Sequence, residues 1–323
     1  MKTLVVTKND ASQRLDKFLK KATVALPDSL LYKYLRKKCV KVNGRHITDG
    51  AFVLSEGDVL SLYMNEAFFV SAEESFLTLE PRLCVAYEDE HLLVAQKPAG
   101  LSCHPDEVQK DKTLVDHLKA YLYRKGEYDP AREHSFAPAL CNRIDRNTAG
   151  LVLCAKDAET LRTLSEMIRA HRVKKEYRAL VYGTPKTKKG TLTLYLQKDE
   201  EARLVHVFDA PRPGAKTAVT DYEVLEERGD VSLLHVRLHT GRTHQIRASF
   251  AHVGHPLVGD AKYADLRERD THGFSHQALC AFSLSFEPNP EDAPLAYLSE
   301  LRVTAKNPNP VFLTATENQY PPA

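Results

Sequence analysis

The chain has 323 residues, of which 43% are hydrophobic and 27% charged, a composition that excludes a disordered or collagen-like chain. At roughly 150 residues per domain, this length predicts about two domains. No apolar run approaches the roughly 18 residues of a membrane span, and no secretory signal or transit peptide is evident, so we expect a cytoplasmic protein. The six cysteines contain no C-x-x-C pair, which favours reduced thiols.

The net charge of +2 is unevenly distributed along the chain. Between Ser12 and Thr48 there are ten lysines and arginines but two aspartates, a surplus of eight positive charges, so the other residues sum to −6. Such asymmetry indicates a nucleic-acid contact at one end of the chain. On charge alone, a solvated charged face explains the same run equally well.

The basic segment is predicted to form two short helices followed by small strands. Ser12 is the expected N-cap of the first helix, and residues 27–29 (Pro-Asp-Ser) open the second. Residues 40–42 alternate like a strand before an Asn-Gly turn signal, and a further strand is expected over residues 59–63. The candidate phosphate-binding residues lie on the second helix and around the first strand: Lys33, Arg36, Lys37, Lys38, Lys41 and Arg45.

This stretch resembles the S-four-like RNA-binding domain, a small module of a ribosomal small-subunit protein and of several RNA-modifying enzymes. The matching residues are RLDKFL at 14–19, LRKK at 35–38 followed by VKVNG at 40–44, and EGD at 56–58. The resemblance implies a small α/β RNA-binding domain over residues 1–70. Residues 71–82, which have acidic residues and no clear period, are the expected linker to a second domain over 83–323.

Strand-like runs dominate the rest of the chain, over residues 84–87, 92–96, 151–155, 175–181, 218–225, 231–238 and 279–286. One helix is predicted from Asp157 to about His171. A second follows Thr243, its expected N-cap, and ends at Gly254. Many strands with few intervening helices favour an α+β domain with a mixed, largely antiparallel sheet.

Two polar segments could supply a carboxylate and an aromatic ring. Asp145 lies between Arg143 and Arg146 in the loop NRIDRNTAG, and neighbouring cations favour an ionised carboxylate that can act as nucleophile or base. The alternative is a structural Arg–Asp pair in a surface loop. The alternation of its predicted strand places the Tyr177 ring on the apolar face of the sheet. A buried tyrosine with a purely structural role is the alternative to a functional one.

A third segment, HTGRTHQIR at 239–247, could face an anion. A strand ends here, Gly241 makes the turn, and a helix follows. Arg242, Arg247 and the start of the helix could together bind a carboxylate or a phosphate. The spacing of a Walker phosphate loop is absent.

These three segments, in this order, resemble the RluA family of pseudouridine synthases. The family pattern, roughly HRLD-x-x-TSG, K-x-Y-x-A-x-V-x-G and TGR-[TS]-HQ-[IL]-R, reads here NRIDRNTAG, KEYRALVYG and TGRTHQIR. QKPAGL at 96–101 and GHPLVGD at 254–260 support the match. The sequence departs from the pattern at Asn142, where histidine is commonest, at Ala149, where serine is usual, and at Ala248-Ser249.

The resemblance implies a catalytic domain of the pseudouridine synthase type and an isomerase that detaches uracil from ribose, rotates it and rejoins it through carbon 5, with no cofactor and no metal. It implies that Asp145 is the essential carboxylate, that Arg247 pairs with it and that Tyr177 stacks on the uracil. Arg143 would fill the gap left by the flipped nucleotide, and Arg146 and Arg242 would complete a ring of arginines that contacts RNA. We expect a monomer that acts on large-subunit ribosomal RNA, with transfer RNA as the alternative.

Two other functions stay open on the residues alone. A metal-dependent hydrolase could use the ligand-like spacings His252-x-x-His255 and His272-x-x-x-His276, although the sequence has no H-E-x-x-H pattern. A non-catalytic RNA-binding relative would be expected to lack Asp145, which is present.

Overall fold

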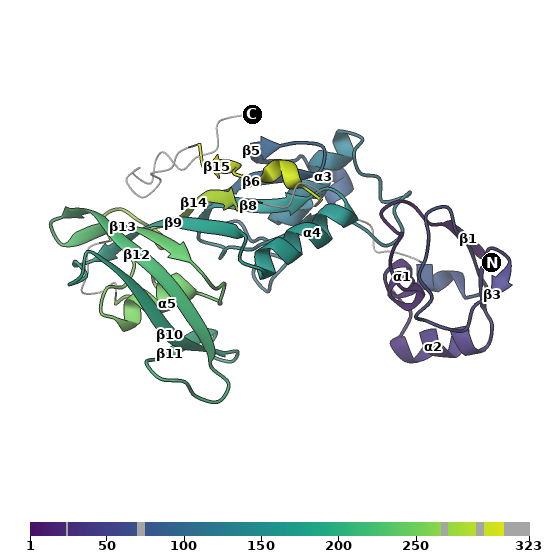
Figure 1. The fold of residues 1–323 in the computed structure, drawn as a ribbon, viewed down its shortest axis with the longest axis horizontal. Helices are drawn as coiled ribbons and strands as arrows, with labels where there is room; N and C mark the ends of the chain where they lie inside the picture. Colours follow the sequence, from purple (N-terminus) through teal and green to yellow (C-terminus); the bar gives the residue numbers. More distant parts are fainter. Residues whose placement is uncertain (24, 70–74, 266–270, 289–293, 307–323) are drawn as a thin grey trace.

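The computed structural model describes residues 1–23, 25–69, 75–265, 271–288 and 294–306 and has two sheets (Figure 1). Within these residues, a four-stranded sheet has the order β1-β4-β2-β3, and a larger sheet has the order β11-β10-β12-β13-β9-β14-β8-β6-β5, with β15 and β7 added beside β14 and β8. Each sheet has its own hydrophobic core, and the chain therefore has a small N-terminal unit and a larger second unit. No helix in the described residues is long and apolar enough to cross a membrane.

The small unit packs two helices on an antiparallel sheet. Its elements are β1 (Lys2–Val5), α1 (Leu15–Ala22), α2 (Asp28–Arg36), β2 (Val40–Val42), β3 (Arg45–His46) and β4 (Val59–Leu62). The second helix and both predicted strands are confirmed, as is the turn between β2 and β3. Asn43 and Gly44 there have φ values of 50° and 78°, the positive values that a two-residue hairpin turn needs.

The predicted N-cap of the first helix is wrong. Ser12 has a φ of 58° and donates its backbone N–H to the Leu54 carbonyl (2.9 Å), and α1 begins only at Leu15. The Leu15 N–H bonds the Phe52 carbonyl at 2.7 Å. A neighbouring loop thus satisfies donors at the helix start that a capping side chain would otherwise satisfy.

The segment between the units is partly packed against the larger one. Short 3₁₀ helices occupy Glu66–Phe69 and Ser75–Thr78, and residues 70–74, which include the start of the expected linker, lie outside the described residues. Phe76 is 2% exposed and belongs to the core of the larger unit, where its ring lies 5.9 Å from that of Tyr128. Burial of this aromatic side chain therefore fixes part of the expected linker against the larger unit.

Polar contacts also join the two units. The side chains of Thr7 and Asn9 donate to the Glu133 carboxylate at 3.1 and 2.9 Å. The fully buried Asp10 accepts hydrogen bonds from the Ser135 N–H (2.9 Å) and hydroxyl (2.6 Å). These contacts hold the small unit against the loop over residues 129–138.

The α+β fold with a mixed, largely antiparallel sheet is confirmed in the larger unit. All its described strand pairs are antiparallel except β8 with β14, which pair in parallel. The predicted strands correspond to β5 (Cys84–Glu88), β6 (Leu92–Lys97), β8 (Ala149–Ala155), β9 (Val173–Tyr182), β12 (Lys216–Arg228), β13 (Val231–Leu238) and β14 (Leu279–Phe286). The sequence did not predict the other strands of this sheet, β7 (Ala139–Leu140), β10 (Lys189–Asp199), β11 (Leu204–Phe208) and β15 (Arg302–Thr304), nor β1 of the small unit.

The helices beside the described part of this sheet are α3 (Leu114–Arg124), α4 (Ala158–Arg169) and α5 (Gln245–His252), with the short 3₁₀ helices Ser75–Thr78 and Ala296–Leu298. The predicted α4 is confirmed, and its N-cap Asp157 accepts the Thr160 N–H at 2.8 Å. The sequence reading missed α3, which starts with a capping box.

The helix α5 ends as predicted but starts differently. Thr243 is not its N-cap. His244 takes that position with a φ of 50° and no side-chain cap. The Gln245 side chain instead accepts hydrogen bonds from the Arg242 N–H (2.9 Å) and the Thr240 hydroxyl (2.8 Å), which fixes the preceding turn. Gly254, with a φ of 87°, follows the helix in a Schellman-type end.

One glycine permits the close approach of β8 and β14 at the centre of the sheet. Gly150 has a φ of 117°, and a Cβ atom there would lie 2.2 Å from the Ala281 carbonyl oxygen. No other residue type fits this position without moving the backbone. The loop that carries Asp145 enters β8 here, so the glycine helps to set where that loop lies.

Candidate active site

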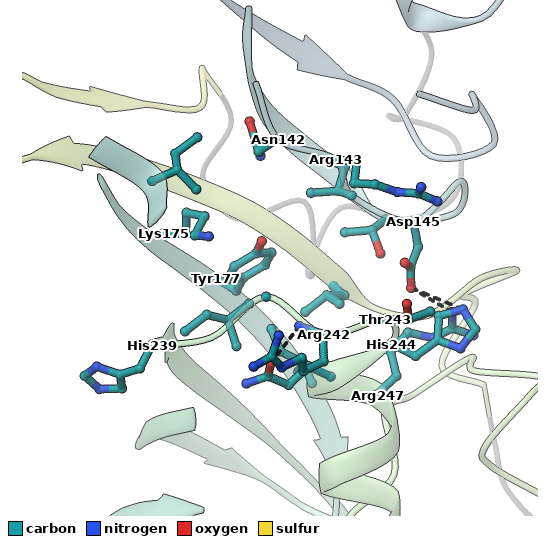
Figure 2. Close-up of a pocket in the computed structure, with 18 of the residues that line it drawn as sticks. Asn142, Arg143, Asp145, Lys175, Tyr177, His239, Arg242, Thr243, His244 and Arg247 are labelled. Carbon is teal, nitrogen blue, oxygen red and sulfur yellow. Dashed lines mark hydrogen bonds and ion pairs between the residues drawn. The ribbon is translucent and has the colours of Figure 1, made fainter. Parts of the chain in front are cut away.

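Three segments that are distant in sequence surround one cavity of about 400 Å³ (Figure 2). They are the loop before β8, the start of β9, and the turn between β13 and α5. The lining residues include all three sequence-predicted catalytic residues, Asp145, Tyr177 and Arg247. Among the remaining lining residues are Asn142, Arg143, Thr148, Ile168, His171, Lys175, Leu238, His239, Gly241, Arg242, His244 and Ile246.

A buried guanidinium connects two carboxylates in the cavity wall. Arg247 Nη1 donates to Asp145 Oδ2 at 2.8 Å, while Nε and Nη2 donate to the two oxygens of Asp260 at 2.7 and 2.8 Å. Arg247 is 7% exposed and Asp260 fully buried. Burial alone would lower the pKa of Arg247, but the hydrogen bonds and charges of Asp260, followed by those of Asp145, raise it overall. The arginine therefore stays charged and has a fixed orientation.

The backbone of the Asp145 loop is held from behind by a buried lysine. Lys97 is fully buried and its ammonium donates to the carbonyls of Pro98 (2.8 Å), Leu101 (2.8 Å) and Arg146 (2.7 Å). Burial lowers the pKa of Lys97 to about 8. These bonds tie the QKPAGL segment to the loop, a role that the sequence reading did not assign to Lys97.

Two hydrogen bonds close the same loop onto itself and onto β8. The Thr148 N–H donates to the Asp145 carbonyl at 3.0 Å. The Asn142 side-chain oxygen accepts the Leu153 N–H at 2.7 Å. Asn142, one of the departures from the family pattern, thus serves as a backbone acceptor for the strand.

Tyr177 lies in the wall of the cavity opposite the loop. Its side chain is 6% exposed, and it shares its face of β9 with the fully buried Ala179 and Val181. Burial, and then the charge of Asp145, raise the pKa of Tyr177, so its phenol is protonated at neutral pH. An apolar face with a protonated phenol is suited to stacking against a planar ring.

His244 is a neighbour of the Asp145 carboxylate that the sequence reading left without a role. Its Nε2 lies 3.8 Å from Asp145 Oδ2, and its Nδ1 lies 2.8 Å from the Tyr263 hydroxyl. The same hydroxyl also accepts the Val205 N–H at 3.0 Å, so Tyr263 joins the His244 ring to the backbone at the start of β11. Burial lowers the pKa of His244 to about 4, so the ring is neutral at pH 7.

The structure separates the four arginines that were expected to form a ring. Arg143 and Arg242 are exposed and line the cavity with Arg247. Arg242 Nε donates to the Thr217 carbonyl at 3.0 Å. Arg146 is not among the lining residues, and its backbone carbonyl accepts hydrogen bonds from the Lys97 ammonium (2.7 Å) and the Gly100 N–H (3.0 Å).

The N-terminal cations belong to the basic region of the small unit and are not among the residues that line the cavity. Figure 1 shows the helices α1 and α2 of this unit apart from the larger sheet. The two aspartates of this region are neutralised, since Asp16 pairs with Arg14 (2.7 Å) and Asp28 with Lys20 (2.6 Å). Lys41 is partly buried, with its ammonium 5.6 Å from the centre of the Tyr63 ring. The other candidate phosphate-binding residues are exposed: Lys33, Arg36, Lys37, Lys38 and Arg45.

Three of the four histidines of the alternative metal site have separate partners. His252 pairs with Asp209 at 3.0 Å, His255 Nδ1 lies 3.0 Å from the Tyr182 carbonyl, and His272 pairs with Asp230 at 3.3 Å. In the part of the chain that the structure describes, no group of three histidine, cysteine, aspartate or glutamate side chains could hold a metal ion.

Comparison with known proteins agrees with both units. Residues 91–252 match the family model described as RNA pseudouridylate synthase, and residues 13–60 match that of the S4 domain. An uncharacterized RNA pseudouridine synthase of Mycoplasma pneumoniae is 36% identical over 294 residues, 87% of each chain. The ribosomal large subunit pseudouridine synthase C of Vibrio cholerae is 32% identical over 264 residues, 80% of this chain and 78% of that protein.

A solved structure shows the same fold. The human RNA Pseudouridylate Synthase Domain Containing 1 matches with a TM-score of 0.55 at 24% identity, over 71% of this chain and 87% of its own.

The buried ion pair between Arg247 and Asp260 predicts a large effect on stability. Asp260→Ala leaves a buried guanidinium without its bidentate partner, and we expect it to lower the free energy of unfolding by about 3–5 kcal/mol. Asp209→Ala, which removes an exposed carboxylate paired with His252, is the matched control and leaves the thermal midpoint nearly unchanged. Equal melting temperatures for the two variants would show that the Arg247–Asp260 pair does not stabilise the fold.

Proposed function

The chain belongs to the RNA pseudouridine synthase family and is an isomerase that acts on RNA; on that premise we propose that it modifies specific uridines of large-subunit ribosomal RNA through Asp145, without a cofactor. The observation that carries the proposal is the Asp145 carboxylate held by Arg247 in the wall of a cavity that Tyr177 also lines. The relative of Vibrio cholerae, which is named for the ribosomal large subunit, supports the choice of RNA.

The reaction needs a carboxylate with one oxygen open to the substrate. Within the described residues, the side-chain contacts of Asp145 to Arg247 and His244 both involve Oδ2, so Oδ1 is the oxygen that meets the ribose or the base. The N1–C1′ bond breaks, uracil keeps the electron pair and rotates, C5 bonds to C1′, and the C5 proton ends on N1. Asp145 assists as nucleophile or as base.

The target uridine reaches this cavity by leaving its stack. We propose that Tyr177 stacks on the extruded uracil and that the exposed Arg143, at the cavity wall, takes the place that the nucleotide vacates. Arg242 and Arg146 lie on the two loops that flank this path and contact the RNA backbone.

The small unit supplies the RNA affinity in this proposal. With Asp16 and Asp28 paired, the basic region keeps a surplus of eight positive charges for phosphate groups. Monomeric state and cytoplasmic location stay predictions from the sequence.

Asp145→Asn tests the essential carboxylate. We expect pseudouridine formation to fall by about a thousandfold or more, because the amide can neither attack nor accept a proton, while RNA affinity stays near normal. A strain carrying only this variant should lose specific pseudouridines of its large-subunit ribosomal RNA that a strain carrying Asp209→Asn keeps. Full modification with Asp145→Asn would contradict the role of Asp145, and a loss confined to transfer RNA would contradict the proposed substrate.

Removing charge from the small unit should weaken RNA binding in a salt-dependent way. For Arg36→Gln, Lys37→Gln and Lys38→Gln combined, we expect the slope of log affinity against log salt to fall by about two to three units, since each phosphate contact contributes roughly 0.7–0.9. The control is Lys20→Gln, because that lysine already pairs with Asp28. An unchanged slope in the triple variant would mean that these cations do not bind phosphate.

A further inference from the structure

A second hollow of about 210 Å³ adjoins the active-site cavity. The two share Ile168, His171, Lys175, Leu238 and His239 in their walls and therefore lie side by side. Figure 2 shows Lys175 on the side of Tyr177 that is away from Asp145. The second hollow therefore lies on the side of the cavity away from the carboxylate, next to the start of β9.

Lys175 lies where the two spaces meet and has no opposite charge beside it. Its side chain is partly buried, and burial is the one influence on its pKa, which it lowers. No ion pair or side-chain hydrogen bond joins it to any described residue. The turn opposite places no side chain over this ammonium at Gly241, where a Cβ atom would lie 3.8 Å from Lys175 Nζ.

The charges around the second hollow leave a positive surplus. Its one carboxylate among the described lining residues, Glu287, pairs with Lys174 at 3.0 Å. Asp221, on the neighbouring strand, pairs with His239 at 2.6 Å and also faces Arg237. Neither carboxylate contacts Lys175. An ammonium that is partly removed from water without a partner costs free energy, which an anionic ligand would recover.

We propose that this second hollow, with Lys175 at its entrance, binds the backbone phosphate of the nucleotide next to the target uridine. The inference rests on the proposed function. An extruded nucleotide stays bonded to both of its neighbours, so the RNA backbone must leave the cavity on either side of it. The hollow gives one such path, and a phosphate is the anion that every neighbouring nucleotide carries. An ammonium offers three donors to its oxygens.

The test is the salt dependence of binding to a single-stranded oligouridylate. For Lys175→Gln we expect about tenfold weaker binding at low salt and a slope of log affinity against log salt that is smaller by about 0.7, the contribution of one phosphate on a single strand. Lys175→Arg should keep the wild-type slope. Lys189→Gln, which removes an exposed lysine paired with Glu223, is the matched control and should also keep it.

A wild-type slope for Lys175→Gln would overturn the subsite. If the preference for oligouridylate over oligocytidylate were lost at the same time, Lys175 would contact the base instead of a phosphate. Failure of the proposed function has a different signature. The wild-type enzyme would then form no pseudouridine in ribosomal RNA, while the slope would still fall in Lys175→Gln.

Discussion

The bidentate ion pair between Arg247 and Asp260 is the constraint on which the site depends. Asp260 follows a tight turn after α5, Arg247 lies in the first turn of that helix, and Asp145 comes from a loop about a hundred residues earlier. A guanidinium can hold two carboxylates at once because its donors point in fixed directions. Two of its nitrogens are fixed by Asp260, so the third meets Asp145 in one orientation. Nearly complete burial makes this geometry costly to disturb.

The rest of the larger unit places the partners of this ion pair. Gly150 lets β8 and β14 approach, and Lys97 holds the loop that precedes β8, so the backbone of Asp145 is fixed from both sides. Tyr177 enters from β9, where Ala179 and Val181 on the same face are fully buried in the core. The proposed catalytic groups thus lie around the centre of the larger sheet, while the N-terminal cations belong to the unit with the smaller sheet.

Regular patterns in the sequence predicted much of the fold, and single contacts explain what they missed. Continuous apolar runs predicted the central strands β6, β8 and β14, because both faces of these strands are buried and side chains on both faces are therefore apolar. The strand β10 has mostly exposed or half-buried residues, so it gave no apolar run. The N-caps predicted at Ser12 and Thr243 were wrong. The backbone of residues 52–54 accepts the N–H groups at the start of α1, and the Gln245 side chain accepts the Arg242 N–H in the turn before α5. The helix α3 could have been found, since Thr113 and Asp116 form a capping box before regularly spaced leucines.

The site was predictable only through the family resemblance. Arg247 and Asp145 are a hundred residues apart, and no periodic pattern connects them. The quoted motifs contain Asp260, Lys97 and His244. No sequence pattern, however, predicts which residue a single buried polar side chain contacts. Their roles follow from distances that only the folded chain supplies.

The most direct test of this account is the single-turnover rate of pseudouridine formation by Asp260→Asn, measured with an RNA fragment that the wild-type enzyme modifies. The amide keeps the volume but removes the charge and one acceptor oxygen, so Arg247 loses its fixed orientation. We predict a rate about 10–100-fold below wild type with an unchanged RNA affinity. A wild-type rate in a folded Asp260→Asn protein would contradict the claim that Asp260, through Arg247, positions the Asp145 carboxylate.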